Sequence, residues 1–512
     1  DAEYQAVFFS NFPDFANSIE SVQIQRGVGT SSRGTAPYAG SVNFESMSLA
    51  RSTRGGELQL SRGSFGTNRG SAEWQSGLQS NRLAVYARLS SQQTAGYRYH
   101  SGNRSVGGFL SGGYFGDQGT LKLTAFTGVS RNQESYLASS IGAIDVDPRD
   151  NPLTDAERDR FVQSMISLSG TRQVGSATTL SATAYTVGAG GDYDVLIGPD
   201  LWNFILSSRV SGGFVTGTTQ RGVLALSAGA HGSAYARDHS LFIRPDFDTR
   251  LYLNTGTKRE ASAFARAAMD VGVVTLHGDL QVRRAWYRYL PDANAGIGER
   301  EINWGFVNPR LGVSVRAAPA LTLFASLGQN GREPARNDMF AGFDNIDTTN
   351  ADFVGPLDRV RPERVRDLEA GLTYRGRTTE ITANLFSMGF RDEITPIGAL
   401  SYIGLPLRKN VPVSYRRGLE LDARVRASSR VTAGGNLTIS RNRIAAYTDD
   451  AAGTTYSDVE PLLTPAFLSN QQLAFSLSDD VSLMVDGRYL SRTFLANTSD
   501  ARFVTPATYT MD

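Results

Sequence analysis

Apolar and polar residues alternate strictly along most of this 512-residue chain, and this pattern constrains the fold more than any other feature. In GLELDARVRA, the apolar Leu419 and Leu421 alternate with Glu420 and Asp422. Successive side chains of a β-strand point to opposite faces, so the pattern predicts strands with one apolar and one polar face. The alternation starts near Glu57 and recurs in runs of roughly 9–14 residues, which give about nineteen strands and the start of another in the final TYTMD.

The connections between these expected strands alternate in length. Short turns such as 116–119 and 318–320 alternate with long polar loops such as 132–162, 190–206, 235–258 and 332–363. An antiparallel meander with short turns on one rim and long loops on the other is the plan of an outer-membrane barrel. A β-solenoid would have a fixed repeat period, which this sequence lacks. The sequence therefore predicts an all-β protein, a transmembrane antiparallel β-barrel with a polar lumen.

Composition argues against several classes of function. The chain has no cysteine, and its 51 Lys and Arg against 50 Asp and Glu leave no basic surplus for nucleic acid. Its four histidines show no metal-ligand or catalytic-triad spacing. No apolar run reaches the roughly 18 residues of a transmembrane helix, and only 154–165 has a helix-like pattern, with Thr154 as its cap. We expect no enzymatic activity, no bound metal and no cofactor.

Aromatic residues near the ends of the expected strands fit the interfacial girdles of a membrane barrel. The alternative is that aromatic residues favour β-strands in any environment. The residues we assign to the girdles are Tyr86, Tyr97, Tyr99, Trp286, Tyr287 and Tyr289.

Glycines gather near the start of the chain, in VQIQRGVGTSSRGTAPYAGSVNFES, residues 22–46. A phosphate-binding loop would end in Gly-Lys-Ser/Thr and lead into a helix, but Gly34 is followed by Thr35 and a strand-like run. A dinucleotide fingerprint fails as well, because Ser32 stands where its third glycine is needed. The glycines therefore predict tight turns between short strands.

The same region resembles a known family. IESVQIQRGVGTSSRGTAPYAGSVNFES, residues 19–46, is similar to the closing segment of the plug domain of TonB-dependent outer-membrane receptors: a strand, a Gly/Ser turn and a second strand. The resemblance continues through NPRLGVSVRAAPALTLFASLGQNGREPARNDMF (308–340), RPERVRDLEAGLTYRG (361–376) and LRKNVPVSYRRGLELD (407–422). It therefore covers nearly the whole chain with several ordered motifs.

The resemblance implies a domain organisation and a function. Residues 1–48 would be the C-terminal part of the plug domain, and residues 49–512 a barrel that has about 22 strands in the complete protein and is C-terminally incomplete here. The segment that pairs with TonB would lie upstream of this sequence. The protein would then import a ferric siderophore or similar iron complex through the outer membrane of a Gram-negative bacterium. It would do so as a monomer surrounded by outer-membrane lipid.

The resemblance also implies plug–barrel contacts. Arg26 of the plug would face two barrel glutamates, Glu369 and Glu420, which the alternation turns toward the lumen. The alternative is that both are ordinary solvated charges of a wet lumen.

Ligand contacts are expected from aromatic and cationic residues in or near the long loops, because such residues suit an anionic, partly aromatic iron chelate. The alternative is that each anchors a loop. Asp344, Asp347 and Asp352 fit no standard calcium loop and predict a solvated acidic stretch. The candidate ligand-binding residues are Tyr97, Tyr99, His100, Tyr136, Trp202, Arg332, Arg336, Phe340, Phe343 and Tyr402.

Other functions remain open at this stage. Cobalamin, haem or a glycan could replace the iron complex, because specificity lies in variable loops. A different class is a passive porin or a surface-adhesion barrel, which the plug-like segment argues against. A soluble array of β-sandwiches is the third interpretation, and the asymmetry of the connections argues against it.

Overall fold

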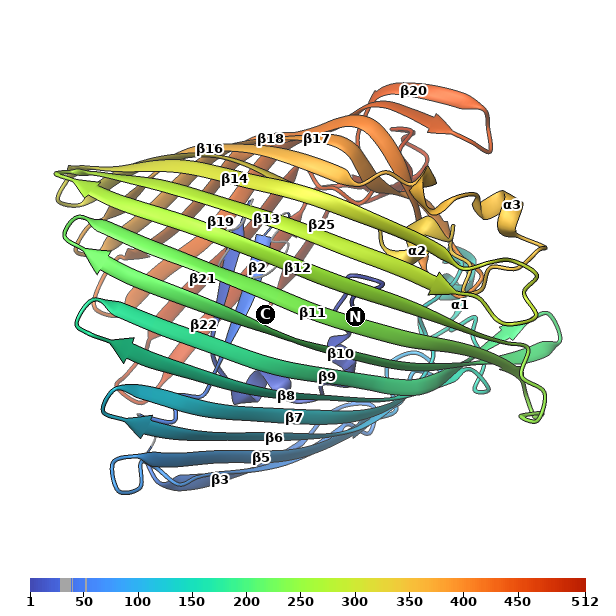
Figure 1. Cartoon of the computed structure of the whole chain (residues 1–512), viewed down its shortest axis with the longest axis horizontal. Coiled ribbons are helices and arrows are strands. Elements are labelled where there is room, and N and C mark those ends of the chain that lie inside the picture. The colour runs from blue at the N-terminus through green and yellow to red at the C-terminus, as the bar shows by residue number, and fades with distance from the viewer. Residues whose placement is uncertain (28–37, 39, 51–52) are drawn as a thin grey trace.

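A single barrel dominates the computed structural model, which describes residues 1–27, 38, 40–50 and 53–512 (Figure 1). Within these residues, twenty-one antiparallel strands form one closed barrel in chain order, with β25 next to β3. The strands β20 and β21 both pair with β19, so the barrel has twenty positions, as the alternation predicts. No helix in the described part of the chain is long and apolar enough to cross a membrane.

The barrel strands are short near the ends of the chain, at β3 and β25, and reach 22 residues in β10 and β17. Their bounds are β3 (Gly55–Arg62), β4 (Asn68–Gln75), β5 (Leu83–Thr94), β6 (Asn103–Gly116), β7 (Gly119–Gln133), β8 (Arg158–Val174), β9 (Thr178–Ile197), β10 (Asp200–Arg221), β11 (Leu224–Ile243), β12 (Tyr252–Val271), β13 (Val274–Leu290), β14 (Arg300–Ala318), β15 (Leu321–Arg332), β16 (Glu363–Arg375), β17 (Thr379–Leu400), β18 (Pro406–Arg426), β19 (Val431–Asp449), β20 (Thr454–Val459), β21 (Phe467–Ser476), β22 (Ser482–Leu490) and β25 (Thr508–Met511).

The smaller elements lie in the lumen and in the long loops. They are η1 (Phe9–Asn11), η2 (Phe15–Ser18), β1 (Ile19–Arg26), β2 (Gly40–Ser46), α1 (Ile141–Val146), α2 (Arg336–Met339), α3 (Ala351–Val354), η4 (Leu357–Arg359), β23 (Thr493–Phe494) and β24 (Val504–Thr505).

The predicted asymmetry of the connections is confirmed, with two corrections. Loop 333–362 and loop 134–157 lie on one rim, whereas β12 and β13 are joined by a two-residue turn on the other. The predicted loop 190–206 is wrong, because β9 and β10 pair up to their tip and continue the wall. The predicted helix at 154–165 is also wrong, since β8 begins at Arg158 and pairs with β7 and β9 along its length.

Alternation separates the two faces of the wall as expected. The outward side chains Leu60, Leu89 and Leu311 are 66–79% exposed, which is the state of lipid-facing residues in a protein without its membrane. On β7, Leu121 is exposed on the outer face, while its neighbour Lys122 points inward and lies 2.6 Å from Ser46 Oγ. The lumen therefore receives the polar half of each strand.

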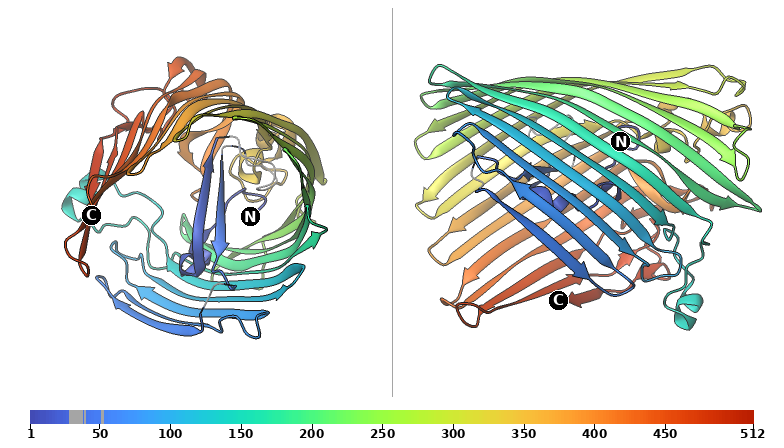
Figure 2. Two further views of the ribbon diagram at one scale, coloured as in Figure 1. Left: turned by 90° about the vertical axis from the view of Figure 1, so that its left-hand side faces the viewer. Right: turned by 90° about the horizontal axis from the view of Figure 1, so that it is seen from below.

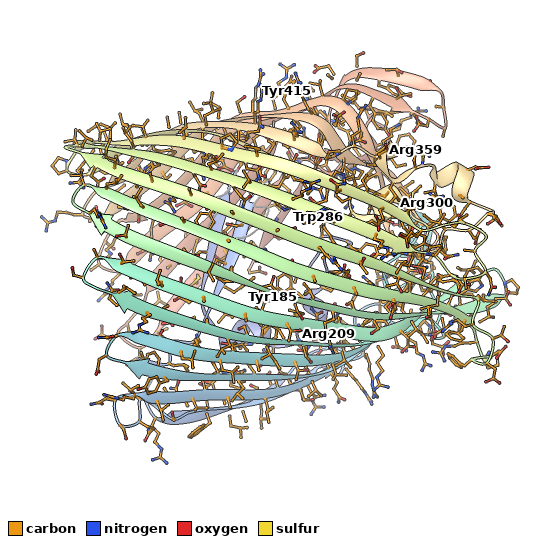
Figure 3. All side chains as sticks on the ribbon, in the orientation of Figure 1. Tyr185, Arg209, Trp286, Arg300, Arg359 and Tyr415 are labelled. Atoms are coloured by element: carbon orange, nitrogen blue, oxygen red, sulfur yellow. The ribbon has the colours of Figure 1, made fainter. Side chains whose placement is uncertain are left out.

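The girdle assignment is wrong for three residues. Tyr86, Tyr287 and Tyr289 are buried inside the barrel, with at most 3% of each exposed. Trp286 directly precedes the lumen-facing Tyr287 on β13 and is 38% exposed on the outer wall (Figure 3). A one-residue step along a strand reverses the face, so aromatic content alone could not assign it.

The described residues among 1–50, which we call the lumen segment, lie inside the barrel (Figure 2). Its strands β1 and β2 form a separate two-stranded antiparallel sheet, in which Ile24 pairs with Val42. The segment packs on the wall through an apolar cluster in which Phe15 and Leu49 meet Tyr86. The Gly34 turn and the nucleotide motifs considered above fall on residues outside the described part.

Candidate functional site

Loop 333–362 folds inward over the start of the lumen segment. The Arg336 amide donates to the Glu3 carbonyl over 2.8 Å, and Gln5 Nε2 donates to the Glu333 carbonyl over 2.9 Å. Arg332 Nη1 donates to Gln5 Oε1 over 3.2 Å. The loop and the segment therefore run side by side at the long-loop end of the lumen.

A buried polar cluster joins the loop, the lumen segment and the wall. The ring of His239 on β11 lies 3.1 Å from Glu3 Oε2 and 2.7 Å from Asp344 Oδ1. Tyr252 donates to Asp344 over 2.6 Å, and Tyr287 donates to Glu3 over 3.0 Å. Both carboxylates and the imidazole are almost completely buried, so removal of any one member leaves a buried polar partner unsatisfied. We call these five residues the lumen tie.

Arg336 completes the lumen tie from the loop side. Its guanidinium lies 3.1 Å from Glu3 Oε1 and donates to Asn254 Oδ1 and to the Asp344 carbonyl, each over 2.7 Å. It also lies 4.5 Å above the ring of Phe340. Both side chains are at most 1% exposed, so they hold the loop in this arrangement.

The charges of the lumen tie determine the pKa values of its carboxylates. Burial acts to raise the pKa of Glu3, but the lowering by Arg336 and His239 is larger than this increase. The pKa of Glu3 therefore falls from 4.5 to about 2. Burial likewise opposes ionisation of Asp344, and His239 and Arg336 hold its pKa well below the ordinary value. Both carboxylates are therefore ionised at neutral pH.

A second charged cluster continues from the lumen tie toward the middle of the barrel. Glu333 lies 2.6 Å from Lys258 Nζ and 2.7 Å from Arg283, and Glu260 lies 2.6 Å from the same guanidinium. Burial acts to raise the pKa of Glu333, but Lys258 and Arg283 hold it below its ordinary value. Loop 333–362 is thus fixed to β12 and β13 by paired charges.

Aromatic side chains cluster on the long-loop rim, in the connections between β3 and β4 and between β5 and β6. The rings of Tyr97 and Phe65 lie 5.4 Å apart, and Arg149 lies 4.7 Å above the ring of Tyr99. Tyr97 and Tyr99 are each nearly half-exposed, and His100 is exposed beside them. These three predicted residues are the ones most open to a ligand in this arrangement.

A second rim group contains the predicted residues Tyr136, Phe343 and Tyr402. The rings of Phe343 and Tyr402 lie 6.1 Å apart, and the Asp344 amide donates to the Tyr402 hydroxyl over 3.2 Å. A Cβ at Gly404, where φ is +79°, would lie 2.5 Å from the ring of Tyr136. The glycine therefore permits the ring of Tyr136 to approach the backbone at residue 404. The group connects the rim directly to the lumen tie through Asp344.

The other predicted ligand residues are packed against neighbouring side chains. Trp202 packs against Phe204 in an apolar cluster of the wall. Arg332 pairs with Glu363 and lies 5.7 Å from the ring of Tyr38. The loop itself is braced further along, where Arg300 donates to the Gly355 carbonyl and Arg359 to the Phe353 carbonyl (Figure 3).

The predicted plug–barrel contact is only partly within the described residues. The side chain of Arg26 lies outside them. Its neighbour Gly27 lies against β16, because a Cβ there would overlap Glu369 Oε1 and come within 2.6 Å of Asp367 Oδ2. Glu420 lies two strands further along the wall, on β18. The end of β1 therefore meets the barrel at one of the two predicted glutamates.

Sequence reasoning missed Glu3, His239, Tyr252 and Tyr287. It placed Asp344 in a solvated acidic stretch, which is wrong, because Asp344 is 1% exposed and paired with His239. The signal was present in β11, where Tyr235, Arg237 and His239 occupy alternate, lumen-facing positions. The expected loop at 235–258 concealed it, because polar residues near a strand end were interpreted as loop. Within the described residues, no group of three acidic or histidine side chains is arranged to hold a metal.

The comparisons with known proteins now identify the class. Residues 55–512 match a family model described as TonB dependent receptor-like, beta-barrel, so the chain belongs to this family, as the motifs predict. Comparison with curated protein sequences gives no significant match.

Solved structures of similar fold come from the same kind of barrel. The siderophore receptor PiuA from Acinetobacter baumannii is 14% identical with a TM-score of 0.75, over 96% of this chain and 79% of that one. The ferric yersiniabactin uptake receptor FyuA from Yersinia pestis is 14% identical with a TM-score of 0.74, over 97% and 77%. The copper transporter OprC is 15% identical with a TM-score of 0.76, over 96% and 77%. At these identities the likeness concerns the fold.

Proposed function

We propose that the protein imports a ferric siderophore or a similar iron complex across the outer membrane of a Gram-negative bacterium, driven by TonB. Membership of the TonB-dependent receptor family supports the mechanism, and the names of PiuA and FyuA support the ligand class. No bond of the ligand is broken in such transport, so the protein acts as a receptor and transporter.

One observation carries the proposal: the lumen is occupied by a segment that is tied to a rim loop through Glu3, His239 and Asp344. A passive porin needs an open lumen, whereas a gated importer needs a removable obstruction linked to its ligand-binding surface. In this proposal residues 1–48 are the last part of a plug domain and residues 49–512 belong to the barrel. TonB acts through a segment outside this chain, and the protein works as a monomer.

The ligand would bind at the rim. Tyr97, Tyr99 and His100 form one side of the proposed surface, and Tyr136, Phe343 and Tyr402 form the other. Because Phe343 and Tyr402 adjoin Asp344, binding there would act on the lumen tie. Arg26 would face Glu369 and Glu420 and hold the lumen segment at the end of β1.

Uptake of labelled metal complexes tests the proposal. The complete gene is expressed in an Escherichia coli strain lacking its own siderophore receptors, and cells receive ⁵⁵Fe as a catecholate, hydroxamate or citrate chelate. We expect accumulation of one chelate class that disappears when tonB is deleted. Labelled cobalamin, haem, a glycan and copper are the comparison ligands. Selective uptake of one of these would replace the iron complex, and uptake that persists without TonB would support a passive pore.

A further inference from the structure

A row of arginines crosses the outer face of the barrel below the long-loop rim. Cross-strand register places Arg104 of β6 directly opposite Arg131 of β7, and Arg131 directly opposite Arg160 of β8. Arg62 of β3 occupies the same level, connected through Asn68 and Gln93, which pair in turn with Arg104. All four guanidinium-bearing side chains are exposed.

This row faces the membrane side of the wall. Two residues further down each strand, at the next outward position, lie Leu60, Val106, Val129 and Val162, which pair across the same strands through Gly70 and Ser91. Leu60 is 79% exposed and Val106 54% exposed, as lipid-facing residues are. Two residues of strand span about 7 Å, so the charges lie immediately above the apolar belt.

Among the described residues, the positive charges of the row lack carboxylate partners. In the described part of the chain, no ion pair joins Arg62, Arg104, Arg131 or Arg160 to an acidic side chain. Asp192, which stands opposite Arg160 on β9, pairs instead with Arg244 over 3.1 Å. Like charges placed directly opposite each other destabilise a sheet, so three adjacent arginines need an external anion.

The surface around the row is hollowed on both sides of it. An upper hollow of about 910 Å³ is lined by polar residues that include Arg158 and Asp155. A lower hollow of about 960 Å³ is lined by Leu60, Val106 and Val129 together with polar residues that include Arg62. The two hollows share Arg104 and Arg131, which therefore stand at the boundary between a polar and an apolar recess.

We propose that this row is a binding site for a phosphorylated lipid of the surrounding membrane. The phosphate lies between Arg104 and Arg131, whose planar guanidinium groups match its oxygens in bidentate geometry. A phosphate monoester carries about −1.5 to −2 charges at neutral pH, which balances two arginines. The acyl chains occupy the lower hollow. The charged row adjoins the apolar belt, so a ligand with both a phosphate and acyl chains fits the site. A free anion would leave the lower hollow unfilled.

Native mass spectrometry of the detergent-purified full chain tests this site. The probes are phosphatidic acid and the diacylglycerol with the same acyl chains, which differ only in the phosphate. We expect phosphatidic acid to bind and diacylglycerol not to bind. The variant Arg104→Gln plus Arg131→Gln should bind phosphatidic acid about tenfold more weakly, because two charge-assisted contacts are lost.

The matched control is Arg284→Gln plus Arg288→Gln on β13, six strands further round the wall from β7. Both arginines are exposed and face outward near the same rim, but Arg288 is already paired with Glu299 and Glu301, and Arg284 donates to Asn303. We expect its binding to stay within about twofold of the unaltered protein. Arg104→Lys plus Arg131→Lys keeps the charge without the fork and should give an intermediate affinity.

Three results would overturn the proposal. Unchanged binding of phosphatidic acid by the Gln double variant would remove the arginines from the site. Equal binding of diacylglycerol would reduce the site to an apolar surface, and displacement of the lipid by excess inorganic phosphate would make it a site for a free anion. Heat-modifiable gel mobility, which a folded barrel retains, verifies each variant before it is titrated.

Discussion

At the scale of single residues, we expect substitutions in the lumen tie to be strongly destabilising. Glu3 and Asp344 are ionised and buried, and the positive charges that stabilise them come from His239 and Arg336. Removal of one partner from a buried pair costs far more than loss of an exposed pair, because the remaining charge is left without solvent or counter-ion.

Glu3→Gln tests this asymmetry. The change should weaken the attachment of loop 333–362 by about 3 kcal/mol, which corresponds to roughly hundredfold faster local opening. Hydrogen–deuterium exchange of peptides covering 332–346 measures it. The control is Glu299→Gln, because Glu299 is 42% exposed in its pair with Arg288 and the change should have little effect. Equal exchange in both variants would contradict the structural role of Glu3.

The pKa of Glu3 predicts an acid-dependent loosening of the same loop. Its pKa falls from 4.5 to about 2 on folding, so its stabilising contribution is complete above about pH 4.5 and is lost as the pH falls toward 2. Exchange of peptides 332–346, corrected for the intrinsic rate, should stay constant from pH 8 to about 5 and then rise. Glu3→Gln should reduce the rise, and protection that persists to pH 2 in the unaltered protein would exclude this cause.

At the scale of elements, β1 and loop 333–362 hold the lumen segment at two distant points. Gly27 at the end of β1 lies against Glu369 of β16, and Glu3 lies against the loop. The two attachments differ in burial: Glu369 is intermediate in exposure, while Glu3 is 2% exposed. We therefore expect the β1 end to be the more easily released.

Glu369→Ala plus Glu420→Ala tests the attachment at β1. Exposed or wet ion pairs contribute about 1 kcal/mol each, so the double change should loosen the segment without unfolding the barrel. The full-length variant should give larger channel conductance in planar bilayers and greater antibiotic leakage into cells. Glu299→Ala plus Glu301→Ala at the rim serves as the control. Conductance equal to that of the unaltered protein would leave both glutamates as ordinary lumen charges.

The exposed rim aromatics give a second prediction at this scale. Tyr97→Ala plus Tyr99→Ala should raise the half-saturating concentration for uptake about tenfold and leave the maximal rate nearly unchanged, since the chain below the rim is intact. Tyr374→Ala is the control, because Tyr374 is similarly exposed but lies near the short-turn rim. A fall in maximal rate without a shift in half-saturation would place the tyrosines in transport instead.

Alternation predicted the wall but could not predict the lumen. Lys122 and Leu121 occupy the faces that the pattern assigns, because a strand repeats every two residues. The strand extensions around Tyr193 were interpreted as a loop, since glycine and aspartate dominate there. The lumen tie joins Glu3 to His239 and Asp344, positions more than a hundred residues apart along the chain, and no local pattern encodes such a contact.

At the scale of the whole molecule, the exposed belt of Leu60, Leu89 and Leu311 requires a lipid or detergent environment. The protein should therefore be extracted from cells only with detergent. The folded barrel should migrate faster than the heated chain in gel electrophoresis, because its closed hydrogen-bonded wall resists the detergent at room temperature. Extraction in plain buffer with no mobility shift would instead support a soluble array of β-sandwiches.

The contacts of the lumen segment are spaced along its length: Glu3 with the loop, Asp14 with Arg88, Ser18 with Tyr86, and Ser46 with Lys122. A pull along the segment from its N-terminal side loads such contacts one after another, as in peeling, rather than together, as in shear. The force required is then set by the strongest single contact and not by their sum. Because the buried charged contact of Glu3 comes first, the other contacts would carry load only after its release.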